Sequence, residues 1–225
     1  MIVSIIPARG GSTEIKMKNI ISLKQKPLIY YTINASKKSR YIDRTIVSTD
    51  NVNIAKTAEK FGSEVIMRPK KLSGNKISLE PTINHVLSHL KKEGVVPSVI
   101  VLLQNTSPLR TFKHIDASIR YFKKGKFDSI LSGSLSHNFI WRKKDNKILS
   151  LNYNPLKRPN RQQMKNEYIE NGAIYITKYS NFNKSKCRIS GKIGLYEMDQ
   201  ISSLQIDSKL DLEIIEYIMK TKNIQ

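Results

Sequence analysis

Two adjacent glycines near the start of the chain make one loop a candidate phosphate-binding site. The loop follows an apolar, β-branched segment at residues 2–6, which predicts a buried strand. Glycines let backbone N–H groups approach phosphate oxygens, and an arginine fork matches phosphate geometry. A plain glycine turn has the same pattern, and neither a P-loop nor a dinucleotide fingerprint is present, so the spacing leaves both interpretations open. The loop contains Pro7, Ala8, Arg9, Gly10, Gly11 and Ser12, and Lys18 follows further on.

A second polar position follows another apolar segment, at residues 98–103, which predicts a central strand. Gln104 comes directly after this segment, and its side-chain amide can both donate and accept hydrogen bonds. Ligands of open α/β sheets bind beyond the carboxyl ends of the strands, so we expect Gln104 and the glycine loop at the same edge. The run at residues 106–110 has the sequence TSPLR, which is typical of a Ser-Pro turn leading into the next helix.

A carboxylate near the end of the chain is a candidate metal ligand. Asp207 precedes an amphipathic segment at residues 210–219, for which Ser208 is the expected N-cap and Asp211 completes a capping box. Mg²⁺ prefers oxygen ligands and is commonly shared between a carboxylate and substrate phosphates. A carboxylate is also favoured at a helix N-terminus without any metal. The position of Asp207 is therefore consistent with both roles.

The elements that must position these residues alternate between strand and helix. Strands are expected at residues 2–6, 45–49, 64–67, 98–103, 129–133, 173–177 and 191–197. Helices are expected at residues 27–39, 52–61, 115–122 and 210–219, and between Leu79 and Gly94. Strands that alternate with helices form right-handed βαβ units. We therefore predict an α/β fold, a Rossmann-like, mostly parallel sheet with helices on both faces, in a single domain over residues 1–225.

The alternation breaks after about residue 136. Residues 138–170 are polar and rich in Lys, Asn and Arg, yet they include Trp141, Tyr153 and Leu156. This segment is too polar to form a core of its own and too apolar to be a solvated linker. We expect an inserted arm, residues 139–170, that packs on the second subunit of a homodimer.

Composition limits the kinds of partner. The 225 residues carry a formal net charge of +21, which attracts anions, but the basic residues are scattered over several predicted helix ends and loops. A solvated basic surface is therefore favoured over a nucleic-acid groove, and binding of nucleic acid without turnover is kept as an alternative. No apolar run is long enough to span a membrane, and residues 2–6 are too few for a signal peptide. Because Cys187 is the only cysteine, a reducing, cytoplasmic location is expected.

Several of these segments together resemble one enzyme family. The sequence IPARGGS at residues 6–12, with Lys18 and Asn19 after it, is similar to the nucleotide-binding signature of acylneuraminate cytidylyltransferases. Further blocks resemble that family in the same order: KPLI at 26–29, VSTD at 47–50, Arg68 with Pro69, LQ at 103–104, TSPLR at 106–110, Arg161 with Gln162, NGAIYI at 171–176, and ID at 206–207. Because the ordered blocks cover nearly the whole chain, the resemblance is specific.

The resemblance implies an activity and assigns residues to it. The activity is transfer of the CMP group from CTP to a nonulosonic (sialic-type) acid, with release of pyrophosphate, in a bacterial surface polysaccharide pathway. The nucleotide would bind Ala8, Arg9, Gly10, Ser12, Lys18, Asn19, Arg68 and Ser78, with Arg9 and Lys18 catalytic. The acidic nine-carbon sugar would bind Gln104, Arg161 and Asn171, since an arginine is a natural partner for a carboxylate. Asp207 would bind Mg²⁺, and the family's dimerisation arm falls on residues 139–170.

The chain departs from the family pattern at four positions. Thr13 and Glu14 stand where a lysine and a glycine are usual, which adds a negative charge near the expected triphosphate. Asn105 replaces a proline, and Gln205 replaces an acidic residue. These departures leave a non-catalytic relative as one alternative, and activation of an eight-carbon sugar acid with CTP as another. The sequence does not distinguish N-acetylneuraminic from legionaminic or pseudaminic acid.

Overall fold

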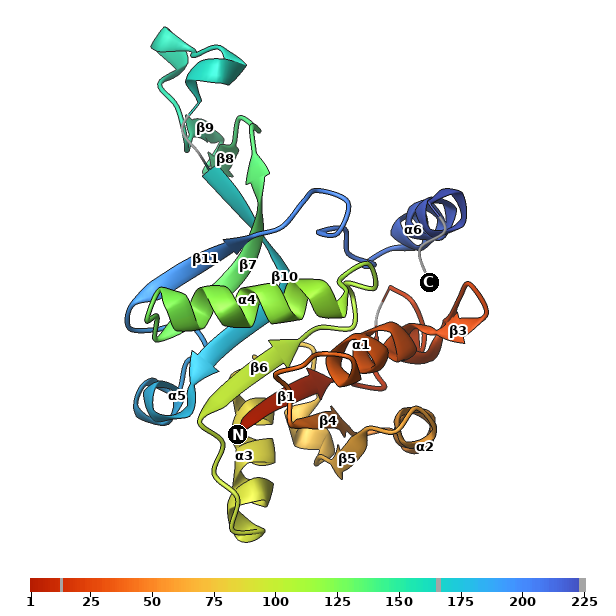
Figure 1. Ribbon diagram of the computed structural model, residues 1–225. Helices are drawn as coiled ribbons and strands as arrows, with labels where there is room; N and C mark the ends of the chain where they lie inside the picture. Colours follow the sequence, from red (N-terminus) through yellow and green to blue (C-terminus); the bar gives the residue numbers. More distant parts are fainter. Residues whose placement is uncertain (13, 165–166, 223–225) are drawn as a thin grey trace.

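Seven strands form one sheet with helices on both of its faces (Figure 1). The computed structural model describes residues 1–12, 14–164 and 167–222, so the departure at Thr13 lies outside the described residues. The order across the sheet is β11-β7-β10-β6-β1-β4-β5. These strands are β1 (Ile2–Pro7), β4 (Arg44–Thr49), β5 (Glu64–Met67), β6 (Val99–Leu103), β7 (Ser129–Ser136), β10 (Glu167–Lys178) and β11 (Ile193–Glu197).

Parallel pairing dominates the sheet, as predicted. β1 pairs in parallel with β4 and β6, β4 pairs in parallel with β5, and β11 with β7. One strand, β10, lies between β6 and β7 and is antiparallel to both. The carboxyl ends of β6, β1 and β4 therefore meet at one edge, which is where ligands bind in open α/β sheets.

Each face of the sheet has its own apolar core, because side chains alternate along a strand. In β1, Ile2 and Ile6 pack on one face, whereas Val3 and Ile5 pack on the other. The first face is covered by α1 (Leu28–Lys37), α2 (Val52–Lys60) and α4 (Phe112–Lys124). The second is covered by α3 (Glu80–Lys92) and α5 (Tyr179–Ser185). The last helix, α6 (Lys209–Thr221), forms a third cluster with the start of α1 and the loop before it.

Local signals set the helix ends close to the predicted positions. The side-chain oxygen of Asn51 accepts hydrogen bonds from two backbone N–H groups at the start of α2. The capping box of Ser208 and Asp211 at the start of α6 is confirmed. Gly62 and Gly94, with φ of +77° and +75°, follow the ends of α2 and α3, where the left-handed conformation favours glycine.

The strand predicted at residues 173–177 is longer than expected. β10 starts at Glu167, inside the predicted arm, and its polar first residues pair with β7. The pairing is interrupted between Glu170 and Tyr175, where Gly172 has φ of +64°. An apolar run reveals burial but not strand direction, so the sequence could show neither the antiparallel pairing nor the polar extension of this strand.

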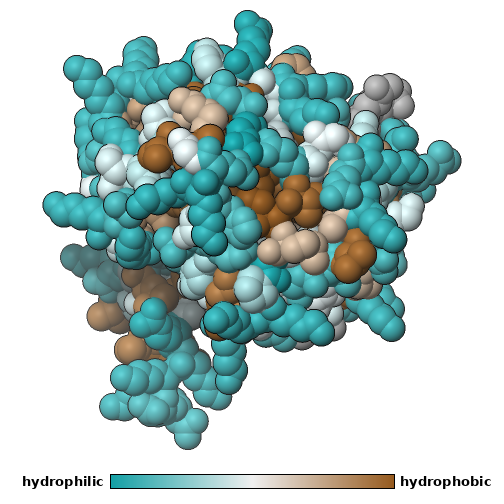
Figure 2. All heavy atoms as spheres, turned by 90° about the horizontal axis from the view of Figure 1, so that it is seen from below, coloured by the Kyte–Doolittle hydropathy of each residue, from teal (hydrophilic) through white to brown (hydrophobic). Residues whose placement is uncertain are grey.

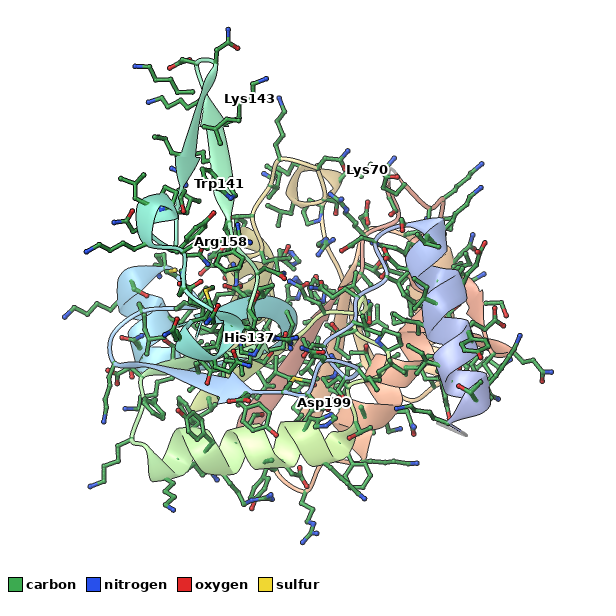
Figure 3. The ribbon with its side chains drawn as sticks, turned by 90° about the horizontal axis from the view of Figure 1, so that it is seen from above. Lys70, His137, Trp141, Lys143, Arg158 and Asp199 are labelled. Carbon is green, nitrogen blue, oxygen red and sulfur yellow. The ribbon has the colours of Figure 1, made fainter. Side chains whose placement is uncertain are left out.

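The remainder of the predicted arm leaves the body of the molecule. A hairpin of β8 (Trp141–Lys144) and β9 (Lys147–Ser150) is followed by 3-10 turns at Pro155–Lys157 and Arg161–Gln163, and Figure 1 shows these pieces projecting beyond the sheet. Asp145 and Asn146 between the two strands have φ of +47° and +59°, as a two-residue hairpin turn requires. In Figure 3, Lys143, Trp141 and Arg158 follow one another from the hairpin tip toward the body.

Two short strands, β2 (Ser22–Leu23) and β3 (Lys26–Pro27), form a separate ribbon, so α1 begins after Pro27 and not at it. Within the described ranges, no helix is both long enough and apolar enough to span a membrane. The face shown in Figure 2 is covered mostly by hydrophilic side chains, with small hydrophobic areas between them.

Candidate active site

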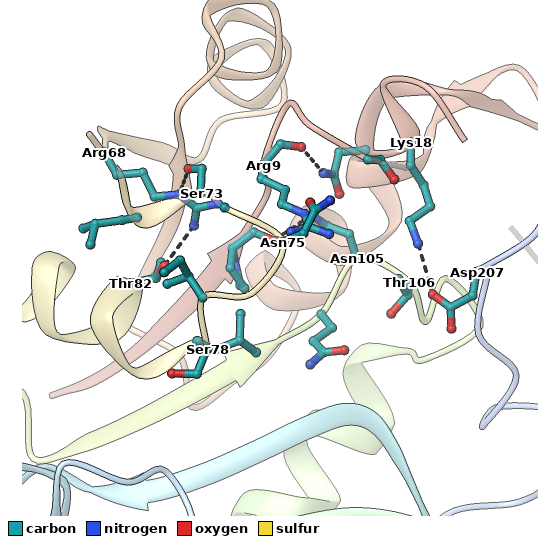
Figure 4. Close-up of a pocket in the computed structure, with 18 residues that line it drawn as sticks. Arg9, Lys18, Arg68, Ser73, Asn75, Ser78, Thr82, Asn105, Thr106 and Asp207 are labelled. Carbon is teal, nitrogen blue, oxygen red and sulfur yellow. Dashed lines mark hydrogen bonds and ion pairs between the residues drawn. The ribbon is translucent and has the colours of Figure 1, made fainter. Parts of the chain in front are cut away.

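A cavity of about 350 Å³ lies where β1 and β6 end (Figure 4). Four parts of the chain border it: the glycine loop after β1, the segment between β5 and α3, the turn after β6, and Asp207. The predicted site residues that line it are Arg9, Ser12, Lys18, Asn19, Arg68, Ser78, Gln104 and Asp207. Lining residues that sequence reasoning missed include Ser73, Asn75, Thr82, Asn105 and Thr106.

The glycine loop is held in place by side chains from neighbouring segments. The backbone N–H of Gly10 donates to Oδ1 of Asp50 at 2.9 Å, and Nδ2 of Asn19 donates to the Arg9 carbonyl at 2.8 Å. A Cβ atom at Gly10 would lie 2.9 Å from the Asn51 side chain, so only glycine fits there without a shift. Ala8 is fully buried and donates its N–H to the Ser48 carbonyl. Ala8 and Gly10 therefore shape the loop beneath the cavity, while Arg9 lines it.

Asn105, one of the four departures, adds a further tie to this loop. Its Nδ2 donates to Oδ1 of Asn19 at 3.0 Å. Since Nδ2 of Asn19 is already committed to the Arg9 carbonyl, the orientation of both amides is determined by this chain of bonds. A proline at position 105 has no side-chain donor, so the bond to Asn19 depends on the residue found here.

Lys18, near the start of the sequence, bonds at the cavity wall to two residues near its end. Its Nζ lies 3.0 Å from Oδ1 of Asp207 and 3.0 Å from the Ile206 carbonyl oxygen. The Lys18 side chain is 15% exposed and the Asp207 side chain 67% exposed. The ammonium is therefore held close to the cavity wall, whereas the carboxylate remains open to solvent.

Arg68 fastens the wall formed by the segment between β5 and α3. Its Nε donates to Oγ of Ser73 at 2.8 Å and its Nη1 to Oγ1 of Thr82 at 3.2 Å, so one side chain ties the middle of that segment to the first turn of α3. Burial lowers the pKa of the Arg68 guanidinium below its ordinary value, and the charge of Arg9 adds to this shift while Asp50 opposes it. Arg68 and Arg9 are thus close enough to influence each other, and both line the cavity.

The same wall is tied to the sheet behind Ser78. Glu80, in the first turn of α3, forms an ion pair with Arg188. The Arg188 guanidinium lies 4.8 Å from the ring centroid of Tyr175 on β10. Burial by itself raises the pKa of Glu80, but its own backbone N–H, Arg188 and the Ser78 hydroxyl together bring that pKa below its ordinary value. The position of Ser78 is therefore linked to β10 through a charged pair.

Comparison with known proteins identifies the family of this chain. A family model described as Cytidylyltransferase matches residues 3–224. The chain belongs to the cytidylyltransferase family. It is 34% identical to the N-acylneuraminate cytidylyltransferase of Escherichia coli O18:K1:H7 over all of this chain and 53% of that protein. It is 28% identical to the post-translational flagellin modification protein B of Campylobacter coli, over all of this chain and 97% of that protein.

Structural comparison agrees at the level of the fold. A solved structure of CMP:2-keto-3-deoxy-manno-octonic acid synthetase, complexed with CTP, superimposes with a TM-score of 0.70 at 16% identity. The superposition covers 98% of this chain and 99% of that one. The chain spans about half the length of the curated N-acylneuraminate cytidylyltransferases it matches.

Two predicted sugar-binding residues of this cytidylyltransferase chain lie outside the cavity lining. Asn171 is buried: its Oδ1 accepts from Oγ of Ser132 at 2.6 Å, and its Nδ2 donates to Oγ of Ser203 at 2.8 Å. Its amide therefore ties β10 to β7 and to the loop after β11. Arg161 lies on the arm and lines a second cavity, of about 410 Å³, together with His137 and Gln200. Gln104 thus lines the same cavity as Arg9, Lys18 and Arg68, whereas Arg161 and Asn171 are not among its lining residues.

The donor set for a metal is small. In the part of the chain that the structure describes, no group of three or more His, Cys, Asp or Glu side chains could hold a metal ion. Asp207 is the one carboxylate among the described residues that line the cavity. Magnesium is commonly held by one or two carboxylates and completed by water and phosphate oxygens, so a single exposed carboxylate fits that mode of binding.

Proposed function

We propose that the chain transfers the CMP group of CTP to a nonulosonic acid and releases pyrophosphate. The observation that carries this proposal is the convergence of Arg9, Lys18 and Arg68 on one cavity in a cytidylyltransferase-family chain. Three cations that line a single cavity concentrate an anionic triphosphate there. The name of a relative at 34% identity, an N-acylneuraminate cytidylyltransferase, supports a sugar acid as the acceptor.

The chemistry is a direct displacement at the α-phosphorus of CTP. The oxygen of the sugar's anomeric hydroxyl forms a bond to the α-phosphorus while the bond from that atom to the bridging oxygen breaks. Pyrophosphate leaves with the bridging oxygen, and the hydroxyl proton passes to solvent. Arg9 and Lys18 neutralise the charge that builds on the phosphate oxygens, which is the main contribution of such sites.

The anchored glycine loop favours this role for Arg9 and Lys18. The bonds from Gly10 to Asp50 and from Asn19 to the Arg9 carbonyl hold the loop backbone before any ligand arrives. Donors that are already in place cost no reorganisation during the reaction. A triphosphate also offers Lys18 a stronger anionic partner than Asp207, whose carboxylate is then free of its ion pair.

Mg²⁺ is part of the proposal. Asp207 would hold the ion together with the phosphates of CTP, and with Gln205 in place of an acidic residue its binding would be weak without the nucleotide. When bound, Mg²⁺ lowers the repulsion between the phosphate oxygens and an incoming hydroxyl.

Pyrophosphate release tests the function directly. Purified protein is incubated with Mg²⁺, each of the four nucleoside triphosphates, and a panel of nine-carbon and eight-carbon sugar acids. We expect release with CTP and a nine-carbon acid, and much less with ATP or GTP. Equal turnover of all four nucleotides, or no turnover with any sugar acid, would refute the proposal, and preference for the eight-carbon acid would redirect the assignment of the acceptor.

The assembly and location follow from the same proposal. We infer a homodimer in which the arm, residues 139–170, packs on the second subunit of a single domain formed by residues 1–225. Exposed apolar side chains on the arm, among them Ile148, Leu149 and Leu156, support this assembly. Since Cys187 is the only cysteine of the sequence, we propose a reducing, cytoplasmic location.

A further inference from the structure

Arg110 is the largest side chain that the fold buries completely, with 1% of its surface exposed. Among the described residues, no carboxylate forms an ion pair with it, in contrast to Arg44, which meets two glutamates, and Arg188, which meets one. Burial lowers the pKa of Arg110 to about 9. Burying a cation without a counter-ion costs free energy, and the hydrogen bonds of the guanidinium must offset part of that cost.

Those hydrogen bonds go to three neutral acceptors on three different segments. Nη1 donates to the carbonyl oxygens of Gln104 and Ala173, at 3.1 Å each, and Nη2 donates to Oγ1 of Thr32 at 2.7 Å. Gln104 follows β6, Ala173 lies on β10, and Thr32 lies on α1. A single guanidinium therefore sets the spacing between the end of β6 and the irregular part of β10.

This spacing determines where the side chain of Gln104 can lie. Gly172, next to Ala173, has φ of +64°, and a Cβ atom there would come within 2.8 Å of Oε1 of Gln104. The Gln104 amide is thus packed against the bare backbone of Gly172 while the residue lines the cavity. If the two carbonyls that Arg110 holds moved apart, the amide would lose its support and its position.

We propose that Arg110 is a positioning residue that holds the Gln104 amide in place for the sugar acid without touching either substrate. The proposal rests on the proposed function, in which Gln104 faces the acceptor. A plain turn at residues 106–110 would not require a buried arginine. The proposal gives Arg110 a role in substrate binding. A displacement of about 1 Å in a substrate-binding group can reduce catalysis about a hundredfold, so a small relaxation at Gln104 has a measurable effect.

Two variants separate positioning from stability. Arg110→Met removes all three bonds, whereas Thr32→Val removes only the bond on the α1 side, away from the cavity. KM and kcat are measured for CTP and for the sugar acid with both purified variants, together with thermal unfolding. We expect Arg110→Met to raise the KM for the sugar acid at least about tenfold while the KM for CTP changes little, on the scale of a misplaced binding group. Thr32→Val should lower the Tm and leave both KM values unchanged.

The result that would overturn the proposal is a folded Arg110→Met protein with the wild-type KM for the sugar acid. Equal increases of both KM values in the two variants would also overturn it, since that pattern indicates a loss of stability alone. If Arg110→Met does not fold, Arg110→Lys keeps the charge and must show the same selective increase.

Gly172→Ala provides an independent measurement, because it leaves Arg110 intact and pushes on the Gln104 amide. It must raise the KM for the sugar acid, and a wild-type value would count against the proposal. Turnover by the wild-type enzyme tests the proposed function separately, so failure of the function and failure of this inference give different results.

Discussion

The cavity and the arm differ in how their polar and apolar groups find partners. Around the cavity, Lys18, Arg68 and Asn19 each bond to a residue from another part of the chain, namely Asp207, Thr82 and Asn105 in turn. On the arm, by contrast, none of the described residues 139–164 and 167–170 takes part in an ion pair. Within the arm, the β8–β9 ladder and a bond from Asn152 to Glu167 are joined by an aromatic group of Phe139, Tyr153 and Trp141, with Arg158 stacked on Phe139.

The two regions should therefore respond differently to substitution. The cavity is ordered within one chain, which suits the stabilisation of charge on a bound nucleotide. The arm leaves large apolar side chains exposed, with Leu156 at 93%, and this is the surface that the proposed second subunit would cover. Substitutions around the cavity should therefore change turnover more than assembly, and substitutions on the arm should change assembly first.

The largest expected effect is at the cavity. Lys18→Ala and Arg9→Ala should each reduce turnover about a hundredfold or more, the scale for losing one preorganised charge-stabilising donor. Thermal stability should fall little, because the Lys18–Asp207 pair is partly exposed. Initial rates of pyrophosphate release and a thermal melt measure both. Lys16→Ala is the matched control, since it removes a charge from the same loop outside the cavity lining; full activity of Lys18→Ala would remove Lys18 from the phosphate site.

The next effect concerns the arm. We expect a dimer at micromolar concentration by light scattering, and Ile148→Lys with Leu149→Lys should weaken it at least about tenfold, since burial of one leucine contributes about 1.5–3 kcal/mol. The fold should survive because both side chains are exposed. Tyr217→Lys, at an exposed position of α6, is the control and should leave the dimer intact. A wild-type protein that is monomeric at this concentration contradicts the assembly.

The proposed magnesium ligand Asp207 allows a smaller, more selective change in turnover. Asp207→Asn should cut turnover most strongly at limiting Mg²⁺, while stability changes little because only a partly exposed ion pair is lost. Gln205→Asp restores a second negative charge and should lower, severalfold, the Mg²⁺ concentration that gives half-maximal rate. A magnesium titration of the initial rate measures both. Normal turnover of Asp207→Asn at limiting Mg²⁺ would show that this carboxylate serves Lys18 and not the metal.

The smallest expected effect tests the anchor behind the cavity wall. The folded pKa of Glu80 lies below its ordinary value, so its ion pair contributes stability above about pH 4.5 that is lost as the pH falls through the folded pKa. Glu80→Gln should therefore be less stable than the wild type at pH 7, by no more than about 1 kcal/mol because the pair is partly solvated. The gap should narrow at pH 3. Urea unfolding at both pH values measures this difference in the free energy of unfolding. Glu59→Gln, at an exposed position of α2, is the control. A difference between wild type and Glu80→Gln that widens in acid would exclude a stabilising role of the Glu80–Arg188 pair.

Part of this architecture could be predicted because it is encoded locally. The period of apolar residues located each strand of the sheet and the five longest helices, and Gly62, Gly94 and Ser208 marked ends that the structure has close to the same positions. The short elements were missed: α5, the β2–β3 ribbon and the β8–β9 hairpin have too few residues for a periodic pattern to stand out.

Some residues of the candidate site could likewise be predicted from the sequence, and others could not. Arg9 and Gln104 closely follow predicted strands, so the rule that ligands bind at carboxyl ends located them, whereas Lys18 was assigned from the resemblance to the family. Ser73, Asn75 and Thr82 belong to a wall whose distance from β1 in the sequence hides their proximity in space. The amide of Asn171 could be recognised as polar, but its commitment to Ser132 and Ser203 depends on neighbours that the sequence does not place beside it.

The alternation of strands and helices, the glycine loop and the family resemblance could all be read from the amino-acid sequence, because they depend on residues that are close together or in a fixed order. Three other features became visible only in the folded chain: β10 runs antiparallel between β6 and β7, Lys18 meets Asp207, and Arg110 joins Gln104 to Ala173. The physical reason is that strand direction and side-chain hydrogen bonds depend on which distant segments become neighbours. That choice is made by the packing of two apolar cores on the sheet, and no local pattern of residues carries it.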